Sequence, residues 1–61
     1  MDVYEFCNLA IEDSENVSIY CFGTGKTVFT GNYEKARHSV YRNEEVLSFG
    51  IEDGIMCINI G

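Results

Sequence analysis

The residues of this chain with the most reactive side chains are three cysteines, Cys7, Cys21 and Cys57, and one histidine, His38. Nucleophilic catalysis by a thiol needs a base close enough to take its proton. The thiols stand in separate apolar stretches without CxxC spacing, and nothing in the pattern brings His38 to any of them. We therefore interpret the cysteines as buried free thiols of a reducing compartment. His38, on the flank of an expected helix, is interpreted as a solvated surface residue.

Gly25-Lys26-Thr27 shares three letters with the end of a phosphate-binding loop. The complete motif requires a glycine five residues before Gly25, where this chain has Tyr20. It also requires a helix after the Lys-Thr pair, whereas Val28-Phe29 favour a strand. We therefore expect a hairpin turn here, and no nucleotide, metal or other cofactor. Because 61 residues leave little volume for a substrate pocket, we also expect no enzymatic activity.

Carboxylates are the most abundant charged groups, with ten acidic residues against four basic ones and a net charge of −6. This balance argues against direct binding to DNA, RNA or an anionic membrane. Seven carboxylates lie in polar segments expected to be loops: Glu12, Asp13 and Glu15; Glu44 and Glu45; Glu52 and Asp53. One interpretation is that these loops only keep the protein soluble. The other is that they present carboxylates to a basic nucleic-acid-binding protein, as phosphates would.

The last acidic pair belongs to a predicted β-hairpin over Val46 to Ile60, VLSFGIEDGIMCINI. Asp53-Gly54 accepts positive φ at both centre positions of a type I′ turn. With these two residues at the tip, Glu52 faces Ile55 and Phe49 faces Ile58. Side chains alternate along a strand, so one face collects six residues that we expect in the core: Leu47, Phe49, Ile51, Met56, Ile58 and Ile60.

Two segments have the apolar spacing of helices. The first covers Asp2 to Ile11, with Asp2 and Glu5 placed as a capping box. The second covers Tyr33 to Tyr41, with Asn32 as its N-cap. The residues expected on the buried stripes are Val3, Phe6, Cys7 and Ala10, widened by Leu9 and Ile11, in the first helix, and Tyr33, Ala36, Val40 and the flanking Arg37 in the second.

Val17 to Phe22 and Thr27 to Thr30 predict a second hairpin, because both are rich in β-branched and aromatic residues. The expected pairs across its turn are Cys21 with Val28 and Tyr20 with Phe29. The element order is then α-β-β-α-β-β. We expect residues 1–61 to form a single small α+β domain, a four-stranded, mainly antiparallel sheet with two short helices.

The arrangement of the helices decides whether one face of this sheet is exposed. If both helices cover the same face, the other face displays an apolar patch larger than a monomer usually tolerates. The candidate interface residues are Tyr20, Phe22, Phe29 and Ile55, with Val46 and Cys57 beside them. A homodimer or a partner protein would cover this patch, whereas one helix on each face would remove it.

The segment VLSFGIEDGIMCINI, with the helix at the start, resembles short acidic proteins carried by bacteriophages and mobile elements of bacteria. Some proteins of this kind are anti-CRISPR proteins or other inhibitors of host defence, and several act as DNA mimics. The resemblance implies that context and no particular target. With no membrane-length apolar run and no signal peptide pattern, we expect a cytoplasmic protein-binding module. It would inhibit a nucleic-acid-binding protein through its acidic surface, or alternatively be a structural or regulatory module that homodimerises through the apolar sheet face.

Overall fold

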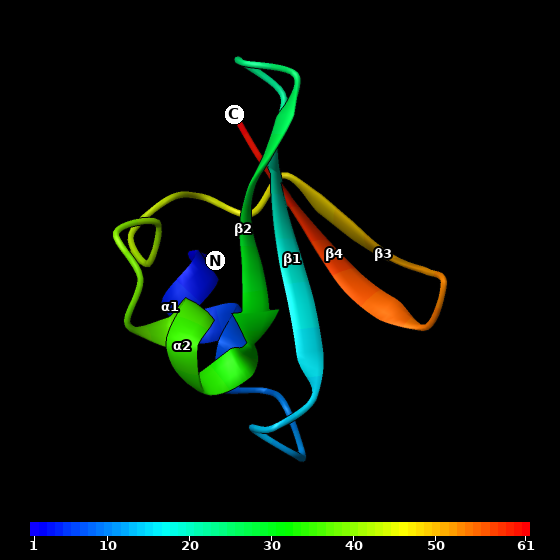
Figure 1. The fold of residues 1–61 in the computed structure, drawn as a ribbon. Helices are drawn as coiled ribbons and strands as arrows, with labels where there is room; N and C mark the ends of the chain where they lie inside the picture. The colour runs from blue at the N-terminus through cyan, green and yellow to red at the C-terminus, as the bar shows by residue number, and fades with distance from the viewer.

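The computed structural model describes all 61 residues, and its element order confirms the predicted α+β fold. The elements are α1 (Val3–Cys7), β1 (Asn16–Cys21), β2 (Lys26–Asn32), α2 (Tyr33–Arg37), β3 (Ser48–Glu52) and β4 (Ile55–Ile60). The strands form one sheet in the order β2-β1-β4-β3, in which two antiparallel hairpins meet through a parallel β1–β4 pair (Figure 1). Neither helix is long and apolar enough to cross a membrane.

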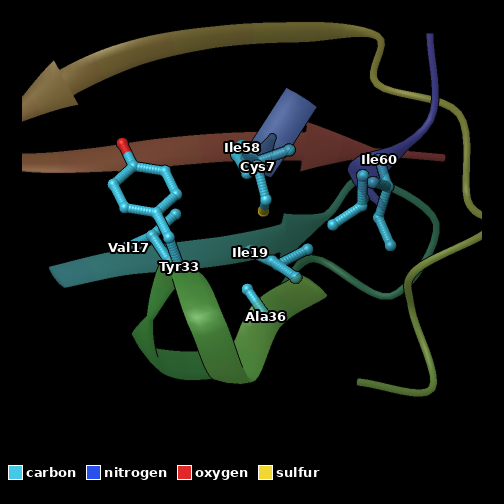
Figure 2. Close-up of a cluster of buried hydrophobic side chains, with 8 residues drawn as sticks. Cys7, Val17, Ile19, Tyr33, Ala36, Ile58 and Ile60 are labelled. Carbon is cyan, nitrogen blue, oxygen red and sulfur yellow. The ribbon is translucent and has the colours of Figure 1, made fainter. Parts of the chain in front are cut away.

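Both helices lie on the same face of the sheet, and the core fills the space between them and the central strands. Ile19 of β1 and Ile58 of β4 are neighbours in the parallel register, and both are completely buried. Figure 2 shows their side chains packed with Cys7 of α1 and Ala36 of α2. The eight buried residues are Val3, Cys7, Val17, Ile19, Tyr33, Ala36, Ile58 and Ile60. The opposite face of the sheet has no helix over it.

The C-terminal hairpin has the predicted turn and register. Asp53 and Gly54 have φ values of 54° and 77°, as a type I′ turn requires, and Glu52 pairs with Ile55. The prediction that both strands bury their apolar face is wrong, because Phe49 is 62% exposed whereas its partner Ile58 is 0% exposed. The physical reason is position in the sheet: the core lies over the central strands, and β3 is an edge strand outside it. The residues left exposed in this way are Leu47, Phe49 and Ile51.

The pairing predicted for the first hairpin is also wrong. Tyr20 pairs with Thr27 and Cys21 with Lys26, and the register shifts between Ile19 and Tyr20. The shift gives β2 one extra residue, a β-bulge, so that Ile19 pairs with Phe29. Paired residues share a face, and Phe29 therefore packs against the core, on the side of the helices.

The helices are capped as predicted but are shorter than predicted. The Glu5 N–H donates to Asp2 Oδ1 at 2.8 Å and the Asp2 N–H donates to Glu5 Oε1 at 3.0 Å, which completes the capping box. The Lys35 N–H donates to Asn32 Oδ1 at 2.8 Å. Helices of five residues are too short to be stable alone, and they persist here through caps and packing. The residues wrongly predicted to be buried beyond the observed helix ends are Leu9, Ile11 and Val40, all exposed.

The start of the chain is fixed by the segment that precedes β3. The N–H groups of Val3 and Tyr4 donate to the carbonyls of Glu44 and Arg42, at 3.0 and 2.9 Å. The Arg42 guanidinium also lies over the Tyr4 ring, 4.7 Å from its centroid. These contacts satisfy helix N-terminal donors that would otherwise need water or a side chain. The long connection from α2 to β3 is thereby held against α1.

Candidate protein-binding surface

The helix-free face of the sheet carries a groove of about 870 Å³, which we call the sheet groove. It runs across β1, β2 and β4, because the side chains that alternate away from the core emerge here. Its apolar part includes Tyr20, Phe22, Ile55 and Cys57. The complete lining is Asn16, Val17, Ser18, Tyr20, Phe22, Thr27, Thr30, Gly31, Glu52, Asp53, Ile55, Cys57 and Asn59.

Three of the four residues predicted as an apolar interface meet in this groove. The rings of Tyr20 and Phe22 pack edge to face with centroids 5.7 Å apart, and Ile55 lies on the same lining. Phe29 does not belong to this surface, because the bulge in β2 turns it toward the core. Val46, which we expected beside them, also packs against the core from the helix side. The helix-free face is thus less apolar than predicted but still exposes aromatic surface.

Carboxylates enter the sheet groove from the turn between β3 and β4. Glu52 and Asp53 both contribute to its lining, and both are exposed. No lysine, arginine or histidine is among the lining residues. The uncompensated charge therefore gives the groove a negative potential beside its apolar part.

The other predicted carboxylates are spread over two further places on the molecule. The loop of Glu12, Asp13 and Glu15 precedes β1, at the same end of the sheet as the β3–β4 turn (Figure 1). Glu44 and Glu45 lie toward the other end, where Glu45 comes 3.8 Å from the N-terminal ammonium. The seven carboxylates therefore do not form one continuous surface. Of the three groups, the Glu52–Asp53 pair is the one that lies beside apolar groove residues.

The three thiols occupy different environments. Cys7 is fully buried, and desolvation raises its pKa above the usual value. Hydrogen bonds from the Thr24 side chain and backbone lower the pKa of Cys21, whose thiol also contacts the Gly61 carbonyl oxygen at 3.2 Å. Cys57 lines the sheet groove and accepts a hydrogen bond from the Ser18 hydroxyl at 3.3 Å. All three cysteines are free.

The one histidine of the chain, His38, lies away from Cys57 in the sheet groove. His38 caps α2, its side chain is exposed, and its Nε2 atom lies 3.5 Å from Glu34. That helix lies on the opposite side of the sheet from Cys57. No three His, Cys, Asp or Glu side chains converge on a point where a metal ion would bind. The sheet groove brings together apolar side chains and the two carboxylates of Glu52 and Asp53.

A second exposed apolar surface, which the sequence pattern did not indicate, follows the free side of β3 on the helix-covered face. We call it the β3 edge patch, and its residues are Met1, Phe6, Leu9, Leu47, Phe49 and Ile51. The rings of Phe6 and Phe49 lie 5.1 Å apart, so α1 and β3 touch through this patch. Alternation in β3 did place Phe49 and Ile51 on one face, but it could not reveal that both stay largely exposed.

Comparison with models of protein families, with curated proteins and with solved structures found no match to this chain.

Proposed function

We propose that this protein is a small, non-enzymatic protein-binding module whose sheet groove binds a basic segment of a nucleic-acid-binding protein. One observation carries the proposal: apolar surface at Tyr20, Phe22 and Ile55 shares a groove with the carboxylates of Glu52 and Asp53, without any basic residue. A segment that carries lysine or arginine next to an apolar anchor would complement both parts of this groove.

Binding of this kind would compete with nucleic acid, because the lysines and arginines that contact phosphate would be occupied by carboxylates. The net charge of −6 would add long-range attraction and raise the association rate. The proposal includes the role of a phage-encoded, anti-CRISPR-like inhibitor that the resemblance implies. The three free thiols are compatible with a reducing, cytoplasmic location.

The experiment is a competition assay with a purified target. Nucleic-acid-binding proteins captured from a bacterial lysate are purified and titrated with labelled DNA or RNA, with and without this protein. We expect nucleic acid to be displaced, and the displacement to weaken as salt rises, because screening reduces attraction between charged surfaces. A target that binds nucleic acid and this protein together, without mutual effect, contradicts the proposal.

A matched pair of double variants localises the effect. Glu52→Gln with Asp53→Asn removes two charges from the groove, and asparagine still tolerates the positive φ at position 53. Glu44→Gln with Glu45→Gln removes the same charge at the other end of the sheet. The first variant should lose most of the competition and the second should retain it. If both double variants lost competition with nucleic acid equally, net charge alone, and not the sheet groove, would attract the partner.

One observation favours a second candidate function, homodimerisation through the same face. Phe22 and Ile55 remain exposed in the sheet groove, and two copies could cover each other there. The candidate predicts that Phe22→Lys abolishes self-association in sedimentation experiments and leaves the fold intact. Self-association that survives this substitution would exclude the sheet groove as the dimer interface.

A further inference from the structure

β3 has few of the features that usually keep edge strands apart, and its one charged residue, Glu52, is at its end. β3 is at the end of the sheet, and all five of its residues are exposed. It contains neither lysine nor proline, and its ladder to β4 is regular over five pairs. The other edge strand, β2, carries Lys26 and a bulge. An exposed, regular and apolar edge is a template for pairing with another strand.

The hydrogen-bonding groups that β3 directs outward can be identified from its register. In a two-residue hairpin the pair next to the turn, here Glu52 and Ile55, is hydrogen-bonded, and such pairs alternate with non-bonded ones. Gly50 therefore directs its N–H and C=O toward β4. Phe49 and Ile51 direct theirs away from the sheet, which leaves two donors and two acceptors without a partner in the ladder.

We propose that a second copy of this chain pairs with β3 in antiparallel orientation, about a two-fold axis that passes beside Gly50. Phe49 of each copy then faces Ile51 of the other, and each such pair exchanges two hydrogen bonds. All the outward N–H and C=O groups of Phe49 and Ile51 on both copies are satisfied. The contact is isologous and closes on itself, so it forms a dimer and not a fibre. This interface lies along the outer side of β3, shares only Glu52 with the lining of the sheet groove, and goes beyond the function proposed for that groove.

If the second copy is shifted along β3 in either direction, fewer of the outward N–H and C=O groups find a partner. A shift in one direction places Phe49 opposite Asp53, which is in the turn with a φ of 54° and cannot continue a ladder. A shift in the other direction places Ile51 opposite Leu47, whose N–H already donates to the Asn59 carbonyl at 2.9 Å. The register about Gly50 is therefore favoured over both.

The side chains along this axis supply the apolar area that a dimer needs. Phe49 and Ile51 point to the helix-covered face, so the β3 edge patches of both copies become continuous. Five of its residues, Met1, Leu9, Leu47, Phe49 and Ile51, are 55–71% exposed. Taking about 200 Å² for a large apolar residue, they expose roughly 600 Å² per copy. Complete burial of this area on both copies would reach roughly 1,200 Å², the lower limit of stable interfaces, before the backbone contacts are added.

Charge makes this association respond to salt in the opposite way to groove binding. In the proposed register Glu52 faces Ser48 of the second copy, so no two carboxylates are directly opposed. Each copy nevertheless carries a charge of −6, and the two repel. Added salt screens that repulsion and should strengthen the dimer, whereas it should weaken binding of a basic partner to the sheet groove.

Analytical ultracentrifugation of two matched variants tests the interface. Ile51→Lys places a charge beside the proposed two-fold axis, whereas Ile11→Lys makes the same change at a fully exposed isoleucine that does not belong to the β3 edge patch. We expect wild type and Ile11→Lys to be dimers whose dissociation constant falls with salt. Ile51→Lys should be a monomer with an unchanged circular dichroism spectrum. Wild type that remains monomeric at high concentration and high salt would overturn the proposal, as would a dimeric Ile51→Lys.

Hydrogen exchange tests the register itself. The amide protons of Phe49 and Ile51 should be protected at high protein concentration and exchange freely on dilution, whereas that of Gly50, bonded to β4, should be protected in both conditions. Protection that does not depend on concentration would overturn the proposed pairing. A dimer that dissociates with Phe22→Lys and persists with Ile51→Lys would place the interface in the sheet groove instead.

A disulfide gives a direct readout of the two-fold axis. A Cβ at position 50 would meet no atom within 4 Å, so Gly50→Cys fits the folded chain, and Cys57→Ser removes the thiol opposite it on β4. Residues at a non-bonded pair approach to about 4.5 Å between Cα atoms, which is within disulfide range. Mild oxidation of this double variant should link position 50 of one copy to position 50 of the other. Failure to crosslink under conditions where the protein is dimeric would exclude this register.

Discussion

The guanidinium of Arg37 holds both carboxylate oxygens of Asp13, with Nη2–Oδ1 at 2.8 Å and Nη1–Oδ2 at 3.2 Å. The same guanidinium donates to Glu34 at 2.8 Å and to the Cys7 carbonyl at 3.1 Å, and the Arg37 side chain is only 14% exposed. This bidentate contact ties the loop after α1 to α2. Asp13, which charge pattern alone assigns to a partner-binding surface, is thus engaged within the molecule.

Asp13 should make folding sensitive to acid. Its hydrogen bonds from Arg37 lower its pKa below the usual 3.8. A carboxyl whose pKa is lower in the folded state contributes stability above its unfolded pKa, and this is lost as pH falls through the folded pKa. Wild type should therefore be more stable than Asp13→Asn at neutral pH, and the difference should shrink below about pH 4. Urea unfolding of both proteins across pH measures this, and the comparison cancels the effects of the carboxylates they share. A difference in the free energy of unfolding that stays constant down to strongly acidic pH would contradict this prediction.

Two apolar residues that face each other across the C-terminal hairpin should differ sharply in their effect on stability. Ile58 is fully buried, and Ile58→Ala should cost about 2–5 kcal/mol, which approaches the whole stability of a small domain. Phe49→Ala should cost about 1 kcal/mol, mainly its contact with Phe6, because Phe49 is exposed. Urea titrations at low concentration, where any dimer has dissociated, provide the measurement. A Phe49→Ala variant as unstable as Ile58→Ala would mean that β3 is buried.

The difference between these two residues also shows how far sequence alone could predict this fold. The turn at Asp53-Gly54 and its register depend on local backbone chemistry and alternation, and both were predicted correctly. Which strand of the hairpin is buried depends on where the helices lie, and that is set by contacts distant in sequence. The bulge that turns Phe29 inward was not predicted, because apolar residues occupy both faces of β2.

The candidate site could be predicted in part for the same reason. Glu52, Asp53 and Ile55 belong to one turn, so the pairing predicted for the C-terminal hairpin was enough to bring them together. Tyr20 and Phe22 come to the same groove only because β1 runs parallel to β4, an arrangement that no local pattern specifies. The β3 edge patch was missed, since a periodic apolar pattern does not distinguish a covered strand from an uncovered one.

Two glycines of the C-terminal hairpin should respond differently to alanine. Gly54 has a φ of +77°, which a residue with a Cβ rarely adopts, so Gly54→Ala should destabilise the protein by about 1–2 kcal/mol. Gly50 has no such φ, and a Cβ there would meet nothing, so Gly50→Ala should be neutral or stabilise by up to about 1 kcal/mol. Thermal unfolding of both variants at low protein concentration measures the difference in stability. If Gly54→Ala and Gly50→Ala destabilised the protein equally, the turn would not be of type I′.

The free thiols should differ in their rates of alkylation. Cys21 should react at lower pH than an ordinary thiol, because hydrogen bonds from Thr24 lower its pKa and favour the thiolate. Cys7 should react only when the protein unfolds, because it is buried and its pKa is raised. Mass spectrometry after timed iodoacetamide treatment follows each site, and Thr24→Ala should slow Cys21 specifically. A Cys21 rate unaffected by Thr24→Ala would contradict the assigned cause.

The same alkylation distinguishes partner binding in the sheet groove from association along β3. Cys57 lines the groove, whereas Cys21 packs against the core side of the sheet, so the two thiols report on opposite faces. A basic partner seated in the groove should slow alkylation of Cys57 and leave that of Cys21 unchanged. Dimerisation along β3 covers neither thiol, so raising the protein concentration should change neither rate.

Cys7 serves as the control, because it reacts only when the protein unfolds. If a variant shows more modification of Cys7, its alkylation rates at Cys21 and Cys57 cannot be compared with those of wild type. Slower alkylation of Cys21 when the partner binds, with Cys57 unaffected, would place the partner on the wrong face for the function proposed here.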